Sequence, residues 1–179
     1  MSVSISAVMG HRWDGFSKTA VEEITRAASS GAGQARWPGP RMFGSPERDF
    51  EANGYVAFHL PGSFSLLYAR NSLCFGLADR WGRLLMYKTV RRHFLSACKR
   101  VARVVGAAEI LLLPEGTILE NSLREGAGFR ELKRRAVRQL GGPPDLDISR
   151  FYTNEEVPVM PQDRVHYFLV SASELNGCS

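Results

Sequence analysis

Cysteine is scarce in this chain: three residues, Cys74, Cys98 and Cys178, are spread over 179 positions. An odd number without close spacing argues against a disulfide framework and against a zinc site, which needs ligand pairs at short spacing. The first ten residues lack the basic flank and long apolar core of a signal peptide. We therefore expect a reduced, cytoplasmic protein.

Long hydrophobic runs are missing too. The densest one, Ile110–Leu113, is far shorter than the roughly 20 residues that a membrane helix requires, so we expect no membrane partner. Neither the P-loop pattern nor the dinucleotide-binding glycine pattern occurs, and we expect no cofactor. No diagnostic catalytic motif is present either, so the sequence leaves the question of enzyme activity open.

Positive charge is abundant and unevenly distributed. The formal net charge is +5, yet residues 80–138 alone contain fourteen basic and five acidic residues, a net charge of +9, and the remainder nets −4. Nineteen of the 23 basic residues are arginine, which suits bidentate contacts to carboxylate or phosphate, although a GC-rich genome gives the same bias. Such polarity predicts a positive face that attracts an acidic partner, protein or nucleic acid.

Hydrophobic periodicity predicts one α+β domain over residues 1–179. Strand 2–9 leads to a helix that starts at a capping box of Thr19 and Glu22 and ends near Gly31. Glycine and proline then predict a long loop at 31–52. Turn residues at hairpin spacing divide 54–88 into an antiparallel four-strand meander. Its expected strands are 55–60, 64–70, 73–78 and 83–88.

The second half of the chain alternates helices and strands. A helix at 89–105, stopped by Gly106, lies between strand 83–88 and strand 109–113. This strand–helix–strand crossover over 83–113 predicts that the second strand runs parallel to strand 83–88, beside it or near it, in a mixed sheet. A helix at 129–140, a long loop at 141–163 and a last strand at 165–171 complete a sheet with two to three helices packed on it.

Two helices carry basic stripes opposite their apolar faces. Together these stripes predict a shared cationic surface that contacts an acidic protein or a phosphate backbone. The predicted contact residues are Arg92, Lys99 and Arg103 on the first helix and Lys133, Arg134 and Arg138 on the second.

Trp81 follows Arg80 and precedes Arg83 at the turn expected between two strands of the meander. Tryptophan at a hairpin tip is hard to bury, and tryptophan flanked by arginine is typical of binding hot spots. These three residues are therefore also candidate partner contacts, although Trp81 folded back over its own hairpin fits the pattern as well.

His11 and Asp14 are the weak catalytic candidates, because they follow the first strand, where α/β proteins often place a general base. No nucleophile is recognisable beside them, and a turn with a partly packed histidine fits the same residues.

The layout from Ala78–Leu84 (Ala-Asp-Arg-Trp-Gly-Arg-Leu) to Gly141–Pro144 (Gly-Gly-Pro-Pro) resembles that of immunity proteins of bacterial toxin pairs, small cytoplasmic α+β domains without catalytic motifs. The resemblance rests on layout and transfers no site. It implies a protein that binds and neutralises a partner as an inhibitor. The alternatives are a nucleic-acid-binding protein that uses the basic helices, and a small enzyme with His11 as acid or base.

Overall fold

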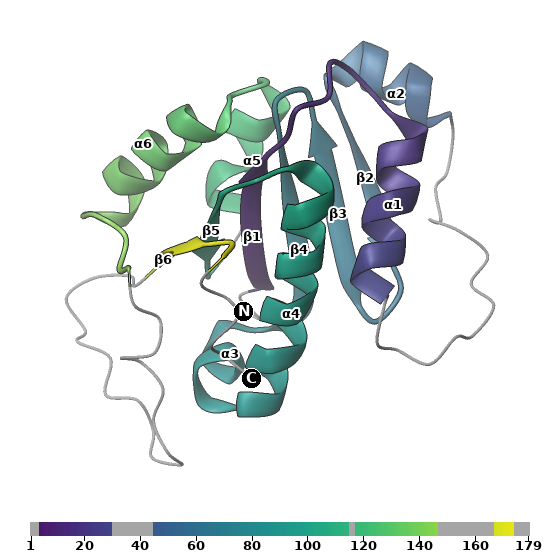
Figure 1. The fold of residues 1–179 in the computed structure, drawn as a ribbon. Helices are drawn as coiled ribbons and strands as arrows, with labels where there is room; N and C mark the ends of the chain where they lie inside the picture. Colours follow the sequence, from purple (N-terminus) through teal and green to yellow (C-terminus); the bar gives the residue numbers. More distant parts are fainter. Residues whose placement is uncertain (1–3, 30–44, 115–116, 147–166, 174–179) are drawn as a thin grey trace.

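The structure is a computed structural model that describes residues 4–29, 45–114, 117–146 and 167–173. It confirms the α+β class, with a six-stranded sheet in the order β2-β3-β4-β1-β5-β6 (Figure 1). The strands are β1 (Ser4–Gly10), β2 (Tyr55–Leu60), β3 (Phe64–Ala69), β4 (Ser72–Arg80), β5 (Glu109–Leu113) and β6 (Phe168–Ser171). The helices are α1 (Lys18–Ser29), α2 (Pro46–Asn53), α3 (Trp81–Met86), α4 (Lys88–Val105), α5 (Thr117–Arg124) and α6 (Phe129–Leu140).

The central strand is β1, which pairs antiparallel with β4 on one side and with β5 on the other. Ala7 stands opposite Phe75 of β4 and Leu112 of β5. Successive side chains of a strand point to opposite faces, and both faces of β1 are covered: Ala7 belongs to one hydrophobic cluster and Val8 to the other.

The helices are divided between the two faces of the sheet. Helices α1 and α4 pack on the face that carries the larger cluster, while α5 and α6 pack on the opposite face (Figure 1). Phe94 and Val101 fix α4 on the first face, and full burial of each contributes about 1.5–3 kcal/mol. Leu123 and Leu132 do the same for α5 and α6 on the second face.

The prediction of a fourth meander strand at 83–88 is wrong, because these residues belong to α3 and the start of α4. Strand β4 continues to Arg80 and the chain turns directly into a helix, in which Leu84 and Leu85 are buried. The guanidinium of Arg91 donates hydrogen bonds to the carbonyl oxygens of Leu84 and Leu85, at 3.4 and 2.8 Å. These bonds occupy acceptors that the end of a helix otherwise leaves without a partner.

The crossover therefore begins at β4, and its two strands are not neighbours, since β1 lies between β4 and β5. Every ladder that joins the described strands is antiparallel, so the sheet is antiparallel rather than mixed. The one parallel pairing in the described ranges is an isolated bridge between Asp145 and Phe168.

Two helix starts also differ from the prediction. Helix α1 is capped by Ser17, whose hydroxyl oxygen accepts a hydrogen bond from the Ala20 N–H, so the capping box at Thr19 is wrong. The end of the expected 31–52 loop is helix α2, which starts at Pro46 and buries Phe50. Residues 31–44 and 147–163 of the two expected loops lie outside the described residues.

Candidate cationic surface

The two predicted basic stripes lie on helices that cover opposite faces of the sheet. We call Arg92, Lys99 and Arg103 the α4 row, and Lys133, Arg134 and Arg138 the α6 row. Helix α4 packs into the larger hydrophobic cluster through Phe94, and α6 packs into the other through Leu132 (Figure 1). The prediction of one shared cationic surface is therefore wrong, because the sheet separates the two rows.

The α6 row is partly compensated by carboxylates of the same chain. Lys133 Nζ lies 2.7 Å from Glu109 Oε2. Arg134 and Arg138 each lie 3.4 Å from an oxygen of Glu131. Arg135 also donates to Glu131, and this hydrogen bond is the main reason why the pKa of Glu131 is lowered. Exposed ion pairs stabilise a fold only weakly, and the single carboxylate of Glu131 is shared by Arg134, Arg135 and Arg138, so the pairs reduce the positive charge of this row without removing it.

The α4 row has no such counter-charge. Helix α4 contains no aspartate or glutamate, and its row makes no ion pair or hydrogen bond within the described ranges. The three residues are seven and four positions apart, which places them on one side of the helix over about 17 Å. Lys88 at the start of α4 is exposed and likewise unpaired in the described ranges. The α4 row is thus the uncompensated cationic feature among the predicted contacts.

Other arginines on α4 have a structural role. Arg91 is buried against the end of α3. The Arg100 side chain joins α4 to α1, because it donates from Nε to the carbonyl oxygen of Ala27 at 2.6 Å and from Nη2 to that of Ala28 at 3.3 Å. Its Nη1 donates to Ser96 Oγ of its own helix at 2.7 Å. These contacts explain why a count of basic residues on α4 overstates its free positive charge.

The expected contact group around Trp81 is rearranged. Trp81 begins α3 and is not at a hairpin tip, and the side chains of Arg80 and Trp81 lie outside what the structure describes. Arg83 pairs with Asp79 at 3.0 Å, and its guanidinium lies over the Tyr87 ring, 5.6 Å from the centroid. Tyr87 is 49% exposed. Sequence reasoning missed this aromatic residue because it assigned Tyr87 to a strand.

His11 is held in place by a backbone bond and aromatic rings. Its Nε2 lies 2.7 Å from the carbonyl oxygen of Ala69, and because a carbonyl only accepts, this nitrogen carries the proton. The imidazole stacks on Tyr68 at a centroid distance of 4.9 Å, beside Trp13. Burial lowers the pKa of His11, so the ring is neutral at pH 7.

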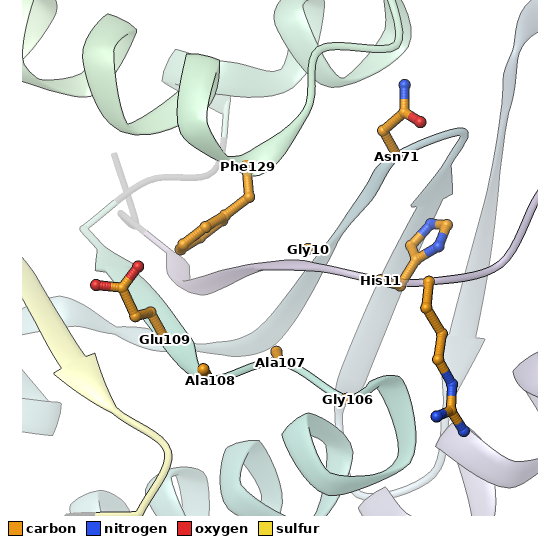
Figure 2. Close-up of a pocket in the computed structure, with 9 residues that line it drawn as sticks. Gly10, His11, Asn71, Gly106, Ala107, Ala108, Glu109 and Phe129 are labelled. Atoms are coloured by element: carbon orange, nitrogen blue, oxygen red, sulfur yellow. The ribbon is translucent and has the colours of Figure 1, made fainter.

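No acid–base pair is assembled around this histidine. Asp14 is exposed and forms no hydrogen bond with His11, and in the described ranges no carboxylate, hydroxyl or thiol is hydrogen-bonded to the imidazole. His11 does line a pocket of about 390 Å³ at the end of β1 (Figure 2). The sequence pattern thus located a concave site but not a catalytic group.

Metal binding finds no support in the same ranges. Over residues 4–29, 45–114, 117–146 and 167–173, no group of three or more His, Cys, Asp or Glu side chains lies close enough to hold an ion. None of the described helices is long and apolar enough to cross a membrane.

The fold and the site together define a class: an α+β protein whose antiparallel sheet carries an unpaired cationic row on one of its covering helices. Beyond this class, no family model, no curated protein and no solved structure matches the chain.

Proposed function

We propose that the protein binds an acidic partner protein through the α4 row and thereby neutralises it, as an immunity-type inhibitor. The observation that carries the proposal is the absence of any counter-charge for Arg92, Lys99 and Arg103 within the described residues, on a helix without a single acidic residue. Unpaired charges of one sign on a rigid element accelerate association with an oppositely charged surface and select against partners of like charge.

The residues at the N-terminal end of α4 favour a protein partner over nucleic acid. Tyr87 is half exposed there and Arg83 lies over its ring. Tyrosine and arginine are the residue types that contribute most of the binding energy in protein interfaces. A nucleic-acid-binding protein would gain from a second cationic surface along the backbone, whereas the α6 row is already paired with Glu109 and Glu131.

The cytoplasm is the compartment in which we place this interaction. Cys74 and Cys98 are both free thiols, and free thiols persist in reducing surroundings.

Two double variants, each lacking two arginines, test the proposal. Arg92→Gln with Arg103→Gln removes charge from the α4 row, and Arg134→Gln with Arg138→Gln removes the same charge from the α6 row. Each purified variant and the wild type serve as bait in a lysate of the source cells. We expect a stoichiometric protein partner on the wild type and on the α6 variant, bound about 3- to 30-fold more weakly by the α4 variant. Equal binding by all three baits, or no stoichiometric partner, would overturn the proposal.

The inhibitor role has its own readout. We expect the captured partner to stop growth when it is expressed alone and to be tolerated when wild-type protein is co-expressed. Protection should be weakened by the α4 variant and retained by the α6 variant. A partner that is harmless on its own contradicts the immunity role, even where binding follows the α4 row.

Nucleic acid is the competing outcome of the same capture. In that case the captured material is sensitive to nuclease, and purified protein binds duplex DNA or RNA with a steep salt dependence. Each lost phosphate contact then changes the log–log slope by about 0.9 on duplex DNA. Such a result would replace the protein partner by a nucleic acid.

A further inference from the structure

The two edge strands of the sheet differ in how their outer sides are covered. Strand β6 has only four residues, and Asp145 pairs with its outer side. The N–H of Asp145 donates to the carbonyl oxygen of Tyr167 at 2.9 Å, and its carbonyl oxygen accepts from the N–H of Leu169 at 3.0 Å. Short length and a covering segment are two of the ways in which proteins prevent an edge strand from pairing with another chain.

Strand β2, at the opposite edge of the sheet (Figure 1), is longer and has no such cover in the described ranges. Its six residues pair with β3 in an unbroken register, from Tyr55 opposite Ala69 to Leu60 opposite Phe64. Alternate residues of an edge strand direct their N–H and C=O groups away from the sheet. No hydrogen bond joins these outward groups of β2 to a described residue. The outer side of β2 therefore offers a row of free donors and acceptors.

The sequence of β2 also lacks the side chains that protect an edge. Tyr-Val-Ala-Phe-His-Leu contains no lysine, arginine, aspartate, glutamate or proline, and charges and proline are what usually prevent pairing at an exposed edge. Val56 and Phe58 are buried in the larger hydrophobic cluster, whereas Ala57 and His59 are exposed on the other face. This alternation fixes the face on which each side chain of an added strand must lie. Strand β2 is therefore a regular template for one further strand.

We propose that β2 pairs antiparallel with β2 of a second copy of this chain, so that the two sheets join across a two-fold axis. A two-fold interface uses the same surface on both copies, so β2 itself supplies both strands. No lysine, arginine or carboxylate of one β2 meets its counterpart on the other, so like charges do not oppose the pairing. A foreign strand is selected by charges or by pockets for its side chains, and β2 has no charge to provide that selection.

Pairing through β2 also limits the assembly to two copies. It uses the uncovered edge of both copies and leaves only the two β6 edges outside, each short and paired with Asp145. The dimer does not involve the α4 row, because α4 packs over β1 and β5, the fourth and fifth strands from the β2 edge. The dimer and the binding of an acidic partner are therefore separate proposals, and either can fail without the other.

Sedimentation equilibrium and amide hydrogen exchange of the full chain test the dimer. We expect a reversible monomer–dimer equilibrium, with the amides of β2 exchanging more slowly at protein concentrations at which the dimer prevails. A chain that stays monomeric at every concentration overturns the proposal, whether its β2 amides exchange freely or are protected by another segment of the chain. A dimer whose formation leaves exchange in β2 unchanged overturns it as well, because the contact then lies elsewhere.

Two lysine variants locate the contact. Ala57→Lys places a charge in the middle of β2, where the two copies meet, and Ala78→Lys adds the same charge at an exposed position of β4, two strands from the edge. We expect the dimer dissociation constant to rise about tenfold or more for Ala57→Lys and to stay unchanged for Ala78→Lys. Equal dissociation constants for the wild type and Ala57→Lys rule out pairing through β2. Because hydrogen exchange is measured on the wild type, the proposal remains testable even if Ala57→Lys does not fold.

Discussion

At the scale of single residues, His11 shows how burial and one hydrogen bond determine what a side chain can do. Its Nε2–H is committed to the carbonyl oxygen of Ala69, and its Nδ1 is buried without a partner in the described structure. A second proton on the ring would thus be placed on a buried nitrogen that has no acceptor. The position that looked like a general base is in this structure a packed, neutral ring that contacts both Tyr68 and Trp13.

This arrangement predicts a specific pH dependence of stability. The pKa of His11 is lowered from 6.5 in the folded protein, so the unfolded chain binds a proton at higher pH than the folded chain does. The contribution of His11 is therefore present above about pH 6.5 and is lost as the pH falls below it. We expect His11→Gln, which can still donate to Ala69, to lose less unfolding free energy between pH 7.5 and pH 5.5 than the wild type.

Urea unfolding of both proteins at the two pH values measures the difference. Because the other titrating groups are common to both proteins, their contribution cancels in the comparison. An equal loss of unfolding free energy in the wild type and in His11→Gln would show that His11 takes up its proton in the folded state as readily as in the unfolded one.

At the scale of elements, the sequence predicted those helices that have both a long apolar stripe and a clear stop. Helix α6 spans the predicted residues 129–140 and α4 ends before Gly106 as expected, because both are followed by a glycine in the left-handed region. The short helices α2, α3 and α5 were missed. A stretch such as Arg83–Lys88 has no full helical period, and its helical turn is accompanied by burial of Leu84 and Leu85 and by the bonds from Arg91.

The role of a left-handed glycine as the stop of a helix can be tested at the C-cap of α6. Gly141 has φ = +78°, and an added Cβ would meet nothing within 4 Å. The cost of Gly141→Ala is therefore conformational, and we expect about 1 kcal/mol of lost stability. Gly141→Asn should cost less, because asparagine tolerates the left-handed region. Chemical denaturation of the three proteins gives both values; an alanine variant as stable as the wild type would contradict the assigned cap.

At the scale of the whole molecule, the sheet determines whether the basic residues of the sequence form one surface or two. The sequence identified all six row residues as basic and correctly placed them on helices. It could not show that α4 and α6 cover opposite faces, because that follows from the pairing of β1 between β4 and β5. Nor could it show that Lys133 pairs with Glu109, which lies 24 positions away. The pair of Glu131 with Arg134 is local, because residues three apart are neighbours on a helix.

A comparison of association rates tests most directly whether α4 alone contacts the partner. Arg92→Glu and Arg138→Glu each change the net charge by the same amount, one on each row. With the captured partner at low ionic strength, we expect the association rate constant to fall about tenfold for Arg92→Glu and to change by less than about twofold for Arg138→Glu. Equal slowing by both variants, or no slowing by Arg92→Glu, would contradict the central claim that the unpaired row on α4 is the binding surface.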